Sequence, residues 1–153
     1  MTVSAAKPAP PLAIAEIADA DVAGVIALWQ ACGLTRPWND PTADIALARR
    51  GPHSTILIGR DGDAIVATTM VGHDGHRGWV YYVATDPGHR GKGHGRAIMQ
   101  AAEDWLRQTG IEKLQLMVRP DNTKVQAFYQ SIGYGEQPRI IFAKWLDGRA
   151  LTP

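Results

Sequence analysis

Glycines and basic side chains alternate in the run PGHRGKGHGR, from Pro87 to Arg96. Glycine lets a backbone turn sharply and approach a ligand, so that main-chain N–H groups face it without interference from a Cβ atom. The run lies between an apolar, strand-like segment and a long amphipathic pattern, so the N-terminus of a helix adds its positive dipole. With the charges of Arg90, Lys92 and Arg96, this combination favours a pyrophosphate-binding turn over a solvated basic loop.

The spacing inside this turn excludes two common nucleotide-binding motifs. A Walker P-loop ends in Gly-Lys-Ser/Thr, whereas Gly93 is followed by His94 and Gly95. A dinucleotide fingerprint requires G-x-G-x-x-G, and neither glycine pair of the turn is followed by a glycine at that distance. The pattern that fits is Arg-x-x-Gly-x-Gly, directly after a predicted strand.

This pattern resembles the pyrophosphate motif of the GNAT family of N-acetyltransferases. A second resemblance lies about thirty residues downstream, where Asn122 is followed by Ala127-Phe128-Tyr129 and by Ile132-Gly133-Tyr134. Two motifs in the expected order make a chance match improbable. The resemblance covers the chain from Leu12 to Trp145, in the order of its predicted elements as well as in its motifs.

The resemblance implies the GNAT fold, an α/β (α+β) architecture with a mixed, mostly antiparallel sheet of about seven strands, four flanking helices and splayed strands 4 and 5. It implies acetyl-CoA as co-substrate, held by main-chain groups of the turn and of the preceding strand, one of which would polarise the acetyl carbonyl. The cofactor-binding residues expected on this basis are Val83, Ala84, Thr85, Arg90, Gly91, Lys92, Gly93, His94, Gly95, Arg96, Asn122 and Tyr129.

Tyr129 matches the family tyrosine that protonates the departing thiolate, and it is the expected catalytic residue. By spacing alone, Tyr129 shares an apolar stripe with Val125 and Phe128, which favours a position in the core. Asn122 also has two interpretations, a helix N-cap and a residue near the thiol end of the cofactor. Both alternatives stay open.

The general base is not evident in the sequence. Many relatives carry a glutamate on the strand before the turn, yet Arg77–Thr85 contains no carboxylate. Histidine titrates in the useful range, but on an exposed turn it is more often only solvated. We therefore expect water to take the amine proton, held by Tyr81 or Tyr82, one of which faces the core. The remaining candidates are His73, Asp74, His76 and Asp86.

The acceptor pocket is expected near Arg36–Asp40, the hairpin His73–Gly78 and the last two strands. The segments Arg36–Asp40 and Gly72–Gly78 resemble more narrowly a YpeA-like bacterial branch of the family, which implies no substrate. Trp38 either fills the core or walls the pocket, and Asp40 either binds a cationic amine or caps the next helix. The expected acceptor-binding residues are Trp38, Asn39, His73, His76 and Tyr81.

The elements that position these groups follow from apolar periodicity. Residues 1–11 indicate a flexible N-terminal tail, 12–147 one domain and 148–153 a C-terminal tail. The expected strands cover 12–17, 54–60, 64–72, 79–85, 113–118 and 139–145. Two helices are expected over 22–33 and 41–50. A third follows the glycine-rich turn and ends at Gly110, and a fourth begins after Asn122. This order is typical of an α/β domain with a mixed sheet.

Composition limits the classes of protein. The 153 residues are 45% hydrophobic and 20% charged, which is typical of a globular chain. The net charge of +1 argues against a nucleic-acid partner, and no apolar run reaches the roughly 18 residues that a membrane span needs. The lone Cys32 excludes a disulfide framework and a multi-cysteine zinc site, so no metal is expected. A cytoplasmic protein is expected.

The expected function is an acetyl-CoA-dependent N-acetyltransferase (EC 2.3.1.-), acting on a primary amine of a small molecule or a peptide. The alternative is a catalytically weak CoA-binding regulatory or interaction module of the same fold, which the missing glutamate favours and Tyr129 opposes. A nucleotide-binding protein is disfavoured by the failed fingerprints. A homodimer is implied only by the family.

Overall fold

The computed structural model describes residues 12–152. Their contacts divide the chain into two compact units, with the boundary between Met117 and Val118. This boundary falls inside the single domain expected over residues 12–147, so that expectation stays a prediction. No helix within residues 12–152 is both long and apolar enough to cross a lipid bilayer.

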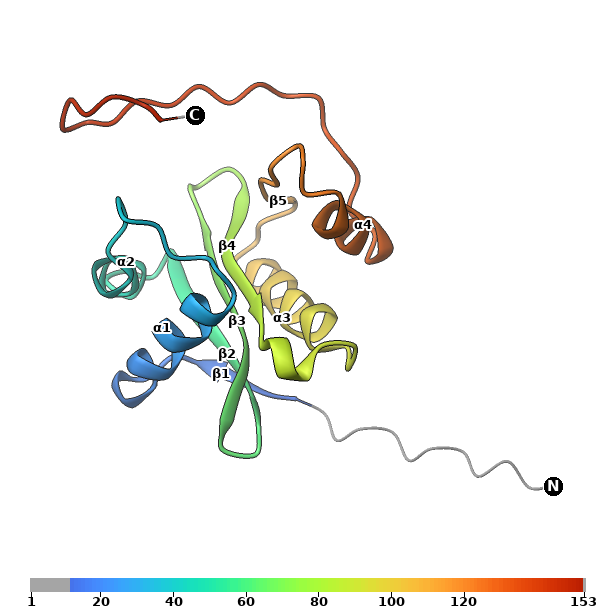
Figure 1. Cartoon of the computed structure of the whole chain (residues 1–153). Helices are drawn as coiled ribbons and strands as arrows, with labels where there is room; N and C mark the ends of the chain where they lie inside the picture. The colour runs from blue at the N-terminus through green and yellow to red at the C-terminus, as the bar shows by residue number, and fades with distance from the viewer. Residues whose placement is uncertain (1–11, 153) are drawn as a thin grey trace. The chain divides into compact units, whose positions relative to one another are not determined.

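The N-terminal unit holds a five-stranded mixed sheet in the order β1-β2-β3-β4-β5 (Figure 1). Strands β1 to β4 pair antiparallel, and β5 runs parallel to β4. The turn Asp61–Asp63 joins β2 to β3 as the sequence predicts, with φ of +60° at Gly62. The strands are Ala13–Glu16 (β1), Ser54–Asp61 (β2), Ala64–His73 (β3), Gly78–Thr85 (β4) and Leu114–Gln115 (β5).

Helices cover both faces of this sheet, with α1 and α2 on one face and α3 on the other (Figure 1). The bounds are Val22–Ala31 for α1, Pro41–Ala48 for α2 and His94–Gln108 for α3. Asp40 caps α2, because its carboxylate accepts hydrogen bonds from the N–H groups of Thr42 and Ala43. Short 3-10 turns lie at Asp19–Asp21, before α1, and at Pro87–His89, after β4.

The core on the α1 and α2 face contains Trp29, Ile45, Ile56 and Ile58, which are almost fully buried. Sequence dictates this arrangement, since apolar side chains recur every third or fourth residue in the helices. In β2 the consecutive residues Ile56, Leu57 and Ile58 are all buried, because helices cover both faces of the sheet. At its edge, the Asp21 carboxylate accepts a hydrogen bond from the Ala18 N–H and pairs with Arg60.

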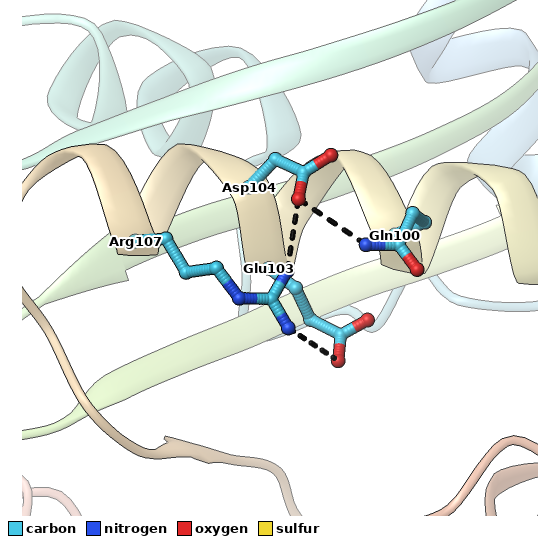
Figure 2. Close-up of polar contacts among 4 residues, drawn as sticks. All are labelled: Gln100, Glu103, Asp104 and Arg107. Carbon is cyan, nitrogen blue, oxygen red and sulfur yellow. Dashed lines mark hydrogen bonds and ion pairs between the residues drawn. The ribbon is translucent and has the colours of Figure 1, made fainter.

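Helix α3 packs its apolar side on β3 and β4, where Ile98, Met99, Ala102 and Leu106 are buried. Its outer side carries a polar network (Figure 2), in which Asp104 Oδ1 accepts from Arg107 Nη1 at 2.8 Å and from Gln100 Nε2 at 3.2 Å. Glu103 Oε1 lies 3.9 Å from Arg107 Nη2. Such pairs, three and four residues apart, each stabilise a helix by about 0.2–0.5 kcal/mol. The apolar side therefore decides where α3 lies.

The C-terminal unit contains α4 (Thr123–Ser131). Asn122 caps this helix, because its Oδ1 accepts from the Val125 N–H at 3.2 Å. The Tyr129 ring is 8% exposed and lies edge-on to Phe128 and Tyr134, at centroid distances of 5.1 and 5.8 Å. Aromatic packing thus builds the core of this unit.

The α/β class and the divergence of β4 from β5 agree with the sequence, but the strand count does not. About seven strands were expected, and residues 12–152 form five. The fifth covers Leu114–Gln115 rather than 113–118, and residues 139–145 form no strand. A strand needs a paired neighbour, which alternation cannot specify, and here Ile140 and Phe142 are 85% and 92% exposed.

Candidate functional site

The glycine-rich turn is an exposed loop between β4 and α3. Gly91 and Gly93 have φ of +78° and +79°, a backbone conformation that favours glycine. A Cβ atom added at either position would meet nothing within 4 Å, so open space lies beside both residues. The turn has therefore the shape that the motif predicts, and its backbone is accessible to a ligand.

The N-terminus of α3 presents main-chain donors at this turn. Gly93 occupies the N-cap position and supplies no side-chain oxygen. Within residues 12–152, the N–H groups of Gly93, His94 and Gly95 have no hydrogen-bond acceptor. The exposed Lys92 adds positive charge. Free N–H groups, a helix dipole and a cation together favour a bound anion such as a pyrophosphate.

His94 brings a buried polar atom to the start of α3. The residue is 8% exposed, and its Nε2 has no hydrogen-bond partner. The His89 ring lies 6.4 Å from the His94 ring, and its Nδ1 is 3.6 Å from Asp86 Oδ1. A buried nitrogen without a partner is unusual in a folded chain. It fits a polar site that a ligand completes, so the residues present are compatible with CoA.

Side chains around the exit of β4 hold the turn in place. Asp86 Oδ1 accepts from the Gly88 N–H at 2.7 Å, and this bond holds the pKa of Asp86 below its usual value. Cys32, at the end of α1, donates from Sγ to the Thr85 carbonyl at 3.3 Å. Burial raises the pKa of the Cys32 thiol, which also contacts Arg90. Asp86 is thus occupied in the turn and is a weak base.

The free edge of β4 leads into the turn. Strand β5 pairs only with Gly78 and Trp79, so within the described part of the chain no strand covers the edge at Val83–Thr85 on that side. On the other side, Met70 pairs with Tyr81 and Thr68 with Ala84. Main-chain groups of the predicted pantetheine segment therefore remain available for a ligand.

The hairpin candidates for the general base maintain the shape of the hairpin. Asp74 Oδ1 accepts from the N–H groups of His76 and Arg77, and its Oδ2 accepts from Trp79 Nε1. These bonds lower the pKa of Asp74 to about 2. His73 Nδ1 accepts from the Gly75 N–H at 3.1 Å. Asp74 is a weak base, and His73 has one nitrogen already engaged.

The predicted acceptor residues do not lie on one face of the sheet. His73 contacts Trp105 of α3, with ring centroids 6.4 Å apart, whereas Tyr81 pairs with Met70, which packs on the opposite core. Trp38 is 43% exposed and Tyr81 45% exposed, so neither fills the core. Asn39 and His76 are exposed. Trp38, Asn39, His76 and Tyr81 therefore stay predicted acceptor residues, whereas His73 lies on the other face of the sheet from Tyr81.

Tyr129 and Asn122 belong to the C-terminal unit. Burial raises the pKa of Tyr129 to about 12, so its phenol keeps the proton at neutral pH. Asn122 is the N-cap of α4, as one of its two interpretations requires. Both motif residues are in position to serve α4, and their roles toward a ligand stay predictions.

A cavity of about 460 Å³ lies at the C-terminal end of α3, away from the turn. It is lined by Glu16, Arg49, Trp105 and Gln108, among others, and contains no residue predicted for the site. The sequence interpretation also missed a polar cluster of Trp29, Asp44, Thr68 and Tyr82, in which Trp29 and Thr68 are fully buried and the other two are half-buried. The only sequence signal for it was the tyrosine pair in β4, where alternation permits one buried ring.

Comparisons with known proteins agree with the two motifs. A family model described as Acetyltransferase (GNAT) family matches residues 17–134. An acetyltransferase of Yersinia enterocolitica is 40% identical over 126 residues, which cover 82% of this chain and 89% of that protein. An uncharacterized N-acetyltransferase of Yersinia pestis is 39% identical with the same coverage.

Two solved structures share the fold. AAC(6')-Iy in complex with the bisubstrate analog CoA-S-monomethyl-acetylneamine has a TM-score of 0.77 at 16% identity, covering 89% of this chain and 99% of that one. The ribosomal-protein-S18-alanine N-acetyltransferase of Escherichia coli has a TM-score of 0.71 at 21% identity, covering 91% and 88%. The matched family model and the two Yersinia relatives show that the chain belongs to the GNAT family of acetyltransferases.

Proposed function

We propose that this GNAT acetyltransferase binds acetyl-CoA along the free edge of β4 and the turn that follows, and acetylates a primary amine. Acetyl-CoA supplies an activated thioester. The chain supplies donors for its pyrophosphate, from Arg90 to Arg96, and main-chain partners for its pantetheine arm, from Val83 to Thr85. The observation that carries this proposal is the turn, with its glycine conformations and acceptor-free N–H groups at Gly93, His94 and Gly95.

Tyr129 is the proposed proton donor to the thiolate. Its raised pKa, about 12, keeps the phenol protonated across the physiological range, and a protonated group is what a general acid requires. Asn122 is proposed to contact the cofactor near its thiol end while it caps α4.

Water is the proposed carrier of the amine proton. The carboxylates of Asp74 and Asp86 accept main-chain hydrogen bonds that lower their pKa values, so both are poorly suited to take a proton. Trp38, Asn39, His76 and Tyr81 are exposed and are the proposed contacts of the acceptor. Small-molecule amines and peptide amines both occur among the acceptors that the names of similar structures imply.

An unbiased amine screen tests this function. The wild-type chain is mixed with acetyl-CoA and a panel of polyamines, aminoglycosides, amino acids and peptides, and released CoA thiol is measured. We expect turnover with at least one amine, and a loss of about 100-fold in kcat for Tyr129→Phe with little change in acetyl-CoA affinity. Tyr134→Phe is the control, since it removes the hydroxyl group of a neighbouring tyrosine in the same unit. Equal activity in Tyr129→Phe would remove Tyr129 from the mechanism.

The alternative function is a CoA-binding module without catalysis. The engagement of Asp74 and Asp86 in turns favours it, because neither is free to act as a base. Tight acetyl-CoA binding without turnover on the whole panel would select this alternative.

Assembly and compartment belong to the same proposal. A homodimer is supported by the exposure of Ile140, Phe142 and Leu146, because such large apolar side chains are commonly covered by a partner. Light scattering after size-exclusion chromatography measures the assembly directly. A cytoplasmic location is supported by the absence of cysteine pairs in the sequence, since a single cysteine fits a reducing compartment.

A further inference from the structure

We propose that Tyr82 is a positioning residue of the acetyl-transfer site, locked by Trp29, Thr68 and Asp44 so that the bulge of β4 keeps its main-chain donors aimed at the thioester. This inference rests on the proposed function, because it assumes that the β4 edge binds acetyl-CoA. It adds a side-chain cluster that belongs to neither of the two motifs.

The bulge is defined by the register of β3 and β4. Met70 pairs with Tyr81 and Thr68 with Ala84, so two residues of β4, Tyr82 and Val83, lie opposite the single residue Thr69. A bulge of this kind bends the strand and redirects its backbone groups. It immediately precedes Ala84 and Thr85, and therefore sets the direction of the edge proposed for the pantetheine arm.

Tyr82 adopts a backbone conformation that tyrosine avoids. Its φ is +50°, and no other described non-glycine residue has a positive φ. A bulky side chain at positive φ is strained and persists only where the surroundings hold it. Strain next to a proposed reacting centre is a recognised mark of a functional backbone.

Three contacts hold Tyr82, each from a different element. Its ring stacks on Trp29 of α1, with centroids 3.8 Å apart and an interplanar angle of 8°. Its hydroxyl donates to Asp44 Oδ2 of α2 at 2.6 Å. Its carbonyl accepts from Thr68 Oγ1 of β3 at 3.0 Å. The ring, the hydroxyl group and the main-chain carbonyl of Tyr82 are thus each held by a different contact.

Thr68 closes this cluster into a continuous network. Its Oγ1 also accepts from Trp29 Nε1 at 2.9 Å, and both side chains are fully buried. One hydroxyl therefore ties the stacked indole to the strained carbonyl. Neighbouring Thr69 is equally buried, but its hydroxyl reaches only the Met70 carbonyl at 3.4 Å. The two threonines form a matched pair, one inside the network and one outside it.

The test measures how strongly the chain polarises the bound thioester, so it needs no acceptor. Isotope-edited infrared spectroscopy of [1-13C]acetyl-CoA compares the carbonyl stretch in solution and on the protein, while calorimetry measures affinity. The variants are Thr68→Val, Asp44→Ala and Tyr82→Phe. The controls are Thr69→Val and Asp63→Ala, and Asp44→Asn is the conservative rescue, since its amide oxygen still accepts from the Tyr82 hydroxyl.

We expect the carbonyl band to move to lower frequency on the wild-type chain, on both controls and on Asp44→Asn. In Thr68→Val, Asp44→Ala and Tyr82→Phe, at least half of that displacement should be lost, with affinity changed by less than about threefold. If the cluster had only a structural role, these substitutions would lower the melting temperature and leave the carbonyl band at its wild-type frequency. An unchanged band in Asp44→Ala and Tyr82→Phe overturns the proposal, even if Thr68→Val fails to fold. No binding by the wild-type chain would instead overturn the proposed function beneath it.

Discussion

The bulge at Tyr82 and the turn at Gly91 and Gly93 both require positive φ, within a dozen residues of each other, and they achieve it by opposite means. The turn uses glycine, and open space lies where a Cβ atom would stand at either position. The bulge uses tyrosine, which stacks on Trp29 and hydrogen-bonds Asp44 and Thr68. The shape of the turn is therefore local, whereas the shape of the bulge depends on three other elements.

The difference suits the two tasks that we propose. A pyrophosphate carries several oxygens and is held by many weak donors, so a flexible, exposed backbone can adapt to it. A single carbonyl requires one donor in one place, because electrostatic stabilisation of a reaction depends on preorganised dipoles. Under this proposal, the locally determined glycine conformation lies at the diphosphate, and the conformation held by three other elements lies at the thioester.

The largest effect is expected at the turn. In Gly93→Val, a β-branched residue would have to adopt φ of +79°, and the strain should rearrange the turn. We expect acetyl-CoA affinity to fall by about 100-fold while the melting temperature stays within a few degrees. Calorimetric titration measures the first and circular dichroism the second. Gly51→Val, at an exposed glycine outside the positive-φ set, is the control. If Gly93→Val bound acetyl-CoA with wild-type affinity, the conformation of the turn would not contribute to binding.

The next effect sharpens the comparison at the bulge. Thr68→Val leaves the buried Trp29 N–H without an acceptor, so the free energy of unfolding should fall by about 1–3 kcal/mol. Thr69→Val should cost less than about 1 kcal/mol, since its hydroxyl makes only one long contact. Urea denaturation of both variants measures the difference. Equal losses in the free energy of unfolding would contradict the stronger hydrogen bonding that we assign to Thr68.

A smaller effect concerns charge at the turn. Lys92 is exposed, so Lys92→Ala should weaken acetyl-CoA binding by about two- to fivefold at low salt, with the difference shrinking as ionic strength rises. Titrations at two salt concentrations test this, with Lys113→Ala as the control. A loss that is independent of salt would point to a structural role for Lys92 instead.

The smallest effect is in alkaline solution. Burial, with a further contribution from Asp44, raises the pKa of Tyr82, and burial raises that of Tyr129 to about 12. An unfolded tyrosine titrates near 10, so the unfolded chain releases its protons first. The free energy of unfolding therefore keeps its full contribution from these two tyrosines below about pH 10. It loses this contribution as the pH rises toward their pKa values in the folded chain. Tyr82→Phe should reduce this alkaline loss in urea denaturation, and an unchanged slope would contradict it.

Local features of the molecule were predictable from sequence because their causes are local. The glycine-rich turn, the hairpin at Asp61–Asp63 and the Asp40 cap of α2 each depend on a few adjacent residues. Apolar periodicity located α1, α3 and the four antiparallel strands for the same reason.

Features that depend on distant partners were not predictable. The Tyr82 conformation requires Trp29, Thr68 and Asp44. These residues lie between 14 and 53 positions before Tyr82 in the sequence. His73 and Tyr81 were both expected at the acceptor pocket because they are close in sequence, but pairing between β3 and β4 sends them to different faces. The apolar segment at residues 139–145, from which a last strand was predicted, likewise carried no information about a pairing partner.

The association of this chain with acetyl-CoA through the turn is the claim on which the rest depends, and competition calorimetry tests it most directly. Acetyl-CoA is titrated into the wild-type chain alone, then in the presence of excess desulfo-CoA, ATP or NAD. We predict one binding site that desulfo-CoA blocks and that ATP and NAD do not. Absence of binding heat from a folded sample, or equal blocking by NAD, would contradict it.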